Sequence, residues 1–276
     1  MAFESERCKW IFLKVERDAL RLSSEPDAAT VHSFRTTCRR LETLLQRLIP
    51  VCDGNQKKLL KLLARIRRRA GRIRDIDVQL AALRSFRVPQ EPRRKRQLVE
   101  QLIEVREEQE QRLAKLLKRR YILEIHKRAR RALQTLKISS LADPLAVAKE
   151  ILSSVSLAGP VTDEVLHRYR IAVKRARYAA EFARRSSEAT QFIARLKQVQ
   201  DALGNWHDWM TLTQTAKKQL GEVSQSPLVA VLHNETRVKF RYAVAALSRN
   251  DADDKPGVSR KLGLNVQRHL APTQAA

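Results

Sequence analysis

Residues 31–48 read VHSFRTTCRRLETLLQRL, and residues 166–183 read LHRYRIAVKRARYAAEFA. The two segments align without a gap and have the apolar spacing of an amphipathic helix. The matched positions are mainly histidine, aromatic or basic: His32 with His167, Phe34 with Tyr169, Arg35 with Arg170, Arg39 with Lys174 and Arg40 with Arg175. A patterned helix that occurs twice in one chain indicates two related helical units.

A second pair of segments repeats in the same order. Residues 62–77 read LLARIRRRAGRIRDID and residues 195–210 read RLKQVQDALGNWHDWM, which pairs Gly71 with Gly204 and Asp75 with Asp208. The offsets of the two matches differ by only two residues. Two matches at nearly one offset predict an internal duplication.

The rest of the chain predicts helices and no strands. Strong helix formers fill long segments, and most of the 7 Gly and 9 Pro lie between these segments. Asp53, Thr162 and the pairs Asp143-Pro144 and Ser226-Pro227 have the residue types of helix N-termini. The predicted helices cover 4–23, 27–49, 54–87, 92–137, 143–157, 162–185, 187–221 and 226–248. We expect an all-α protein of two tandem four-helix bundles, with unit one at 1–140, unit two at 141–248 and a mostly disordered tail at 249–276.

Composition points to an anionic partner. The chain has 55 Lys and Arg against 30 Asp and Glu, a formal net charge of +25, and a hydrophobic content of 43% that can form a core. Such an excess of positive charge repels itself in a compact state, and a polyanion would relieve that repulsion. Three cysteines without a C-x-x-C pair favour a reducing compartment. No apolar run suggests a signal peptide or a membrane span, so we expect a cytoplasmic protein that does not enter membranes.

The repeated helices carry their charges in rows. At about 100° per residue, His32, Arg35 and Arg39 lie within an arc of about 60°, opposite the leucines of the same helix. In the second copy, His167, Arg170, Lys174 and Tyr178 share one face opposite an alanine-rich face. A charge run alone is usually a solvated face. Solubility does not require a histidine at the same helical position twice, so we interpret the rows as a binding site.

Other residues are weaker candidates. Arg65, Arg72 and Arg74 lie in the helix at 54–87, and Lys197 lies in the helix at 187–221. We expect His126, His233 and His269 to be structural or surface residues. His207 precedes Asp208 near Gly204, where we expect it to form a local hydrogen bond.

The motifs resemble those of the conserved-histidine α-helical domain family, abbreviated CHAD. The segments that carry the resemblance are VHSFRTTCRRL at 31–41, GRIRDID at 71–77, LHRYRIAVKRARY at 166–178 and LKQVQDALGNWHD at 196–208. One departure is Val199 where the family usually has Leu, and Thr43 stands where the second copy has Tyr178. The two halves therefore need not bind a ligand identically.

The resemblance implies two four-helix bundles around a basic central channel, binding of inorganic polyphosphate, and association with polyphosphate granules. The residues that match the family's motifs are His32, Arg35, Arg39, Arg40, His167, Arg170, Lys174, Arg175 and Tyr178, with Arg65, Arg72, Arg74 and Lys197 as further candidates. Arginine forks bind phosphate oxygens in pairs, and lysine adds point charges. A nearby phosphate would favour the charged form of each histidine, whereas neighbouring arginines oppose it.

The sequence raises two other possible functions, nucleic-acid binding and catalysis. Net charge favours nonspecific nucleic-acid binding, but an aromatic content of 5% and the absence of a helix-turn-helix or zinc module oppose a dedicated interface. Catalysis on polyphosphate would need carboxylates that hold Mg²⁺. The string Glu108-Gln109-Glu110-Gln111-Arg112 resembles the E-x-E-x-K of triphosphate-tunnel enzymes but lies in a predicted helix, where residues two apart point to different faces. We expect no catalytic residue, no metal and no cofactor.

Overall fold

The computed structural model describes residues 5–86, 91–137, 143–155 and 159–254, and within these ranges it is helical without strands. The helices are α1 (Ser5–Ser24), α2 (Ala28–Thr43), α3 (Gly54–Ser85), α4 (Pro92–Ala114), α5 (Arg119–Gln134), α6 (Pro144–Ser153), α7 (Asp163–Ala180), α8 (Ser187–Leu220) and α9 (Pro227–Asp254). A π-helical turn, η1 (Leu44–Leu48), follows α2. The all-α prediction is confirmed. The predicted tail at 249–276 lies outside the described residues from 255 onward.

The helix starts follow the local chemistry of the sequence. Asp53 accepts a hydrogen bond from Gln56 N, and the Gln56 side chain accepts one from Asp53 N, which makes a capping box. Thr162 caps α7 through its hydroxyl, and Asp143 caps α6 through its carboxylate. Ser226 Oγ accepts a hydrogen bond from Val229 N at the start of α9. The four predicted N-caps are confirmed.

The predicted helix at 92–137 is wrong as a single element. It divides into α4 and α5, and hydrogen bonds from Leu116 N to Leu113 O and from Leu117 N to Ala114 O tighten the chain between them. Neighbouring residues of a straight helix point about 100° apart, yet Leu116 and Leu117 are both 9% exposed. The turn buries both leucines and brings α5 back along α1 and α3.

Other helix ends also differ from prediction. The α-helix of α2 stops at Thr43 and continues as the π-turn, and α7 ends at Ala180 rather than at 185. α9 runs to Asp254, past the predicted end at 248. At the end of α7 the chain turns so that Phe182 and Ala183 enter the core. Packing therefore decides the ends of α2 and α7, whereas α9 ends two residues before Pro256 in the sequence.

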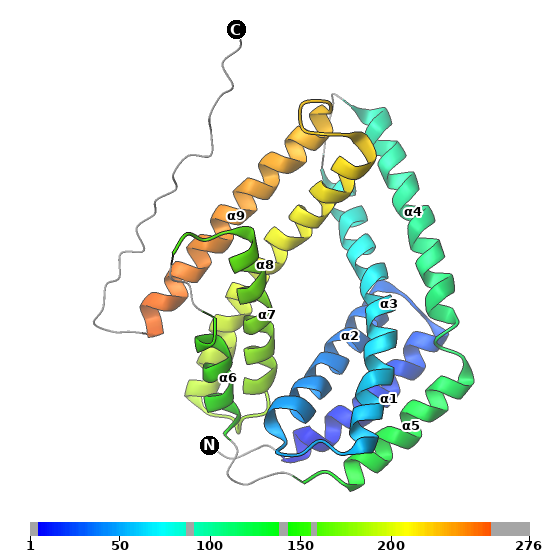
Figure 1. The fold of residues 1–276 in the computed structure, drawn as a ribbon, viewed down its shortest axis with the longest axis vertical. Helices are drawn as coiled ribbons and strands as arrows, with labels where there is room; N and C mark the ends of the chain where they lie inside the picture. The colour runs from blue at the N-terminus through cyan, green and yellow to red at the C-terminus, as the bar shows by residue number, and fades with distance from the viewer. Residues whose placement is uncertain (1–4, 87–90, 138–142, 156–158, 255–276) are drawn as a thin grey trace.

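The helices form two halves that meet along α2 and α7 and along α3 and α8 (Figure 1). The first half holds α1–α5 and the second holds α6–α9. One apolar cluster runs through both halves, with Phe12 and Phe34 in the first and Phe182 and Trp206 in the second. The two halves therefore share a core.

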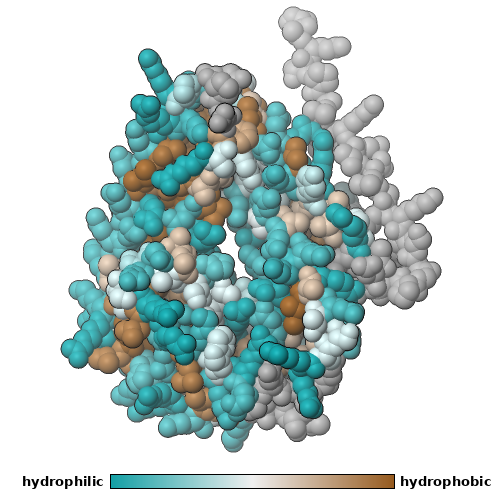
Figure 2. Space-filling model, turned by 180° about the vertical axis from the view of Figure 1, so that it is seen from behind, coloured by the Kyte–Doolittle hydropathy of each residue, from teal (hydrophilic) through white to brown (hydrophobic). Residues whose placement is uncertain are grey.

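A second contact region lies at the far ends of the long helices, which we call the tip. A separate apolar cluster there joins α3 and α4 to α8 and α9, and includes Leu83, Leu98, Leu212 and Leu228. Glu91 accepts hydrogen bonds from Ser226 Oγ at 2.7 Å and from Leu228 N at 2.8 Å. Arg94 donates to the carbonyl of Gln225. Between the shared core and the tip, Figure 2 shows the surface hollowed near the centre of the molecule.

Within the described part of the chain, no helix combines the length and the apolar character that crossing a membrane requires.

Candidate functional site

The first basic row lies on α2. Asp27 starts this helix by accepting a hydrogen bond from Thr30 N at 2.7 Å. The apolar face of the helix is buried and consists of Val31, Phe34, Cys38 and Leu41. The opposite face carries His32, Arg35 and Arg39, of which Arg35 is half-buried. The burial pattern thus confirms the predicted faces of this helix.

The second row lies on α7. Thr162 Oγ1 accepts a hydrogen bond from Val165 N, and the buried face consists of Leu166, Tyr169, Val173 and Ala176. His167, Arg170 and Lys174 lie away from this face, with His167 exposed and the other two half-buried. The arrangement repeats that of α2.

The two rows face each other across the junction of the halves. Burial lowers the pKa of Lys174 to about 8, together with the positive charges of Arg170 on its own helix and of Arg35 and Arg39 on α2. Burial also lowers the pKa of Arg35 and of Arg170, and the charge of Arg35 adds to the effect on Arg170. Residues far apart in the sequence therefore form one crowded group of cations.

Carboxylates from the long helices offset only part of this charge. Asp75 of α3 lies 3.7 Å from a guanidinium nitrogen of Arg35, and Asp208 of α8 acts in the same sense on Arg170. The Arg35 guanidinium rests against Gly71, where a Cβ atom would stand 3.8 Å from it. Arg170 Nε is buried and has no hydrogen-bond acceptor among the described residues. The matched contacts are what a duplication would produce, and the duplication itself stays a prediction.

The histidines are shifted toward the neutral form. Burial lowers the pKa of His32, and Arg74 of α3 is the strongest of the cations that lower it further. Partial burial also lowers the pKa of His167, and the neighbouring His207 lowers it further. The rings of His167 and His207 stack with centroids 5.6 Å apart. The local hydrogen bond expected for His207 is not formed by its Nδ1, which has no hydrogen-bond partner among the described residues and lies 3.7 Å from Asp208 Oδ1.

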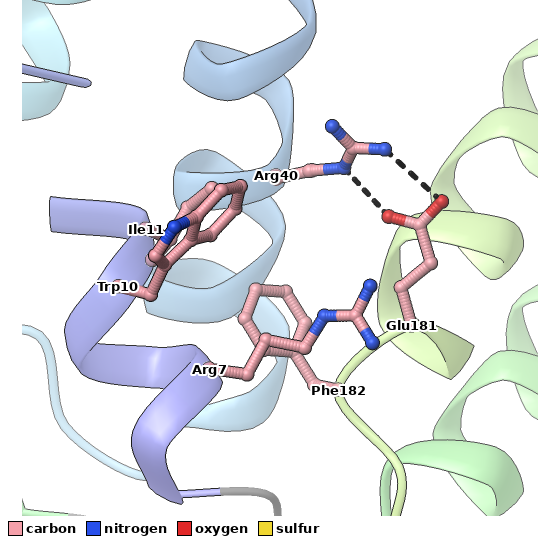
Figure 3. Close-up of a pocket in the computed structure, with 6 residues that line it drawn as sticks. All are labelled: Arg7, Trp10, Ile11, Arg40, Glu181 and Phe182. Carbon is pink, nitrogen blue, oxygen red and sulfur yellow. Dashed lines mark hydrogen bonds and ion pairs between the residues drawn. The ribbon is translucent and has the colours of Figure 1, made fainter. Parts of the chain in front are cut away.

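Arg40 and Tyr178 belong to a contact that joins the halves. Arg40 Nε donates to Glu181 at 2.6 Å (Figure 3), and Arg177 donates to the same carboxylate at 2.6 Å. Both guanidinium groups lie over the Tyr178 ring. A small pocket beside the contact is lined by Arg7, Trp10, Ile11, Arg40, Glu181 and Phe182. Arg40 and Tyr178 are therefore engaged within the protein.

The structure adds Arg67 to the predicted cations. Its guanidinium lies 3.4 Å from Glu42, which also pairs with Arg39 at 3.1 Å. Arg67 and the predicted Arg74 lie seven residues apart and flank Gly71 on the face of α3 that meets α2. The seven-residue spacing of Arg67 and Arg74 predicts from the sequence alone that the two side chains share a face of the helix.

The remaining predicted residues are dispersed. Arg65 and Arg72 are exposed on a face of α3 roughly 140° or more from that of Arg67 and Arg74. Arg175 is exposed on α7, roughly 60° or more around the helix from the row. Lys197 is exposed on α8, about 16 Å along the helix from Asp208. The structure brings together His32, Arg35, Arg39, Arg74, His167, Arg170 and Lys174.

These observations define an all-helical protein in which each half turns a histidine-headed basic row toward the other. The CHAD domain family model matches residues 13–217. The chain therefore belongs to the CHAD domain family, as its motifs indicated.

A solved structure agrees with this assignment at the level of the fold. The crystal structure of the CHAD domain from the plant Ricinus communis is similar to this chain with a TM-score of 0.59 and 20% sequence identity. The similarity covers 91% of this chain and 89% of the plant chain. No curated protein matches the sequence.

Proposed function

We propose that this protein binds inorganic polyphosphate between α2 and α7 without transforming it. The observation that carries the proposal is the group of half-buried cations that α2 and α7 bring together, Arg35, Arg170 and Lys174. Burial and these neighbouring charges lower the pKa of Lys174 to about 8. A group of like charges held this closely opposes folding unless a counter-ion joins it. A polyanion that enters from the hollow in Figure 2 would supply the missing negative charge.

The residue types suit phosphate. Arg35 and Arg170 offer planar guanidinium forks, which bind phosphate oxygens in pairs. Lys174 adds a point charge, and His32 and His167 add N–H donors whose pKa rises when an anion approaches. The site has few aromatic groups on which bases could stack, so it favours a backbone of phosphates over nucleic acid.

The carboxylates of Glu108, Glu110 and Asp77 are engaged by arginines, which supports binding without catalysis. Glu108 pairs with Arg112, and Glu110 pairs with Arg106 at 2.7 Å. Arg106 also holds Asp77 at 2.6 Å. These contacts leave Glu108, Glu110 and Asp77 with their own counter-charges, whereas metal-assisted phosphoryl transfer needs carboxylates on a metal ion.

The proposal is tested with the double variant Arg35→Gln/Lys174→Gln. Wild-type protein should retain long-chain polyphosphate at about 150 mM salt, where exposed charges are largely screened, and the variant should not. Arg184→Gln/Arg185→Gln removes the same charge from exposed positions and serves as the control. Equal retention by both variants would contradict the site.

Two further measurements separate this function from its alternatives. Duplex DNA at equal charge concentration should not displace polyphosphate, and displacement would favour a nucleic-acid binder. Polyphosphate should stay intact with Mg²⁺ or Mn²⁺, and release of phosphate would instead identify an enzyme. In cells, a fluorescent fusion should gather at polyphosphate granules, and the double variant should remain diffuse.

A further inference from the structure

A second basic feature lies on the outer face of α3. We call it the α3 stripe, and its members are Lys57, Lys61, Arg65, Arg68 and Arg72, all of which are exposed. At about 100° per residue they fall within an arc of about 80°, and they extend for roughly 22 Å along the helix. They are distinct from Arg67 and Arg74, which face α2.

The stripe lacks a counter-charge among the described residues. From Gly54 to Arg74 the helix contains no Asp or Glu. Across the described ranges, none of the stripe residues forms an ion pair, whereas Arg67 pairs with Glu42 and Arg69 donates to Gln109. Like charges three or four residues apart destabilise a helix, so the stripe costs folding free energy in the free protein.

The matching helix shows that the fold does not need these charges. With Gly71 aligned to Gly204, the stripe positions correspond to Thr190, Ala194, Gln198, Asp201 and Asn205 of α8. These residues are also exposed, and none is basic. Two helices in corresponding places thus differ by a whole row of cations, and solvation of an exposed helix face does not account for that difference.

The stripe adjoins the site between α2 and α7. Arg68 neighbours Gly71, because residues three apart on a helix lie on nearby parts of its surface, and Arg72 follows Gly71 about 100° around the helix. The Arg35 guanidinium covers Gly71 from the other side. Arg35 therefore stands between the facing rows and the nearer end of the stripe.

We propose that the α3 stripe is a second segment of one polyphosphate path. A long chain held by Arg35 and Lys174 continues past Gly71 and along α3 toward Lys57. The inference rests on the proposed function and adds chain-length selectivity to it. A short oligophosphate occupies only the site between α2 and α7, whereas a long chain also neutralises the stripe.

The test compares tripolyphosphate with long-chain polyphosphate. The stripe variant Lys61→Gln/Arg65→Gln/Arg72→Gln should bind tripolyphosphate like the wild type. Loss of three phosphate contacts should weaken long-chain binding roughly 10- to 50-fold near 0.15 M salt and reduce the salt slope of log K by about 2. The control Arg184→Gln/Arg185→Gln/Arg241→Gln removes the same net charge from exposed positions and should change neither quantity beyond a uniform small loss.

Each outcome is decisive. Equal long-chain affinities of the stripe and control variants would overturn the inference. If Arg35→Gln/Lys174→Gln loses tripolyphosphate while the stripe variant keeps long chains, the proposed function stands and the stripe does not. If the wild-type protein binds neither ligand, both proposals fall. Should the triple variant not fold, Arg65→Gln and Arg72→Asn measured singly give the same comparison in smaller steps.

Discussion

The long helices α3 and α8 occupy corresponding places in the two halves, and they agree on one side and differ on the other. Toward the junction, Gly71 and Asp75 of α3 correspond to Gly204 and Asp208 of α8. Toward solvent, α3 carries the basic stripe and α8 carries no cation at the matching positions. The inner contacts thus serve both halves, and the outer charge is a property of the first half alone.

The ion pairs next to the two basic rows also differ between the halves. In the first half, Glu42 joins Arg39 and Arg67 and is 27% exposed in its side chain. In the second half, Glu181 joins Arg177 to Arg40 of the other half and is 7% exposed. The contact at Glu181 is more deeply buried and joins the halves, so we expect its removal to lower the free energy of unfolding by more.

The largest expected effect is therefore at Glu181. Glu181→Ala leaves Arg177 and Arg40 partly buried without their anion, and should lower the free energy of unfolding by about 3 kcal/mol or more. Glu42→Ala, in the more exposed contact, should cost about 1 kcal/mol. Urea unfolding monitored by circular dichroism measures both. Equal losses would show that the two contacts do not differ as their burial indicates.

Grafting the stripe onto α8 sharpens the comparison of the long helices. Ala194→Lys/Gln198→Arg/Asn205→Arg places cations on α8 at the positions that match Lys61, Arg65 and Arg72. Long-chain polyphosphate should bind roughly 10- to 50-fold more tightly, with a salt slope steeper by about 2. The same cations on α9, at Asn234, Val238 and Ala245, provide a control for net charge. An equal gain from the α9 variant would mean that position along the path does not matter.

The rows themselves differ at Lys174, which corresponds to Arg39. Below about pH 8 the free protein already carries the Lys174 proton, and above it the proton must be taken up when phosphate binds. Because the phosphates favour the charged form, Lys174 should add little to the pH dependence of the Kd below about pH 8 and should raise the Kd by up to about tenfold per pH unit above it, whereas proton uptake by His32 and His167 acts at lower pH. Isothermal titration calorimetry at pH 7, 8 and 9 measures this rise. Lys174→Arg should remove it, and a persistent rise in that variant would assign the proton to another group.

The smallest effect concerns stability in the absence of ligand. Lys61→Gln/Arg65→Gln removes repulsion between cations four residues apart and should raise the free energy of unfolding by about 0.2–0.5 kcal/mol per pair. Gln198→Ala on the matching face of α8 should leave stability almost unchanged. Thermal melts at low salt are the most sensitive measurement, since salt screens the repulsion. A destabilised double variant would show that the stripe residues make contacts that stabilise the fold.

Much of the site follows from helical periodicity. The spacing of His32, Arg35 and Arg39 placed them on one face, and the repeat predicted the same face on α7. Periodicity does not say what lies across from a face. Arg40 was grouped with the row, and its partner Glu181 lies far along the chain, in the other half. The division of the helix at 92–137 also escaped prediction, because burial of Leu116 and Leu117 causes it and no proline or glycine marks it.

The similarity between the two pairs of sequence segments indicates which residues to compare, and the structure separates two kinds of candidate. Arg65 and Arg72 share a helix with Arg74 but not its face, which a helical wheel of 54–87 would have revealed. Arg67 was overlooked among many cations because its distinguishing contact, with Glu42, is tertiary. Local pattern therefore identifies rows of residues, and tertiary contacts decide which rows act together.

The tip has a topological consequence for any polymer that lies between the halves. The shared core bounds the intervening space at one end, and the hydrogen bonds of Glu91 to Ser226 and Leu228 bound it at the other. Under the proposed function, a strand that crossed this space would have no sideways exit while both closures hold. Release must then occur by reptation from a free terminus or by parting of the tip, so residence time should scale with the length of the strand.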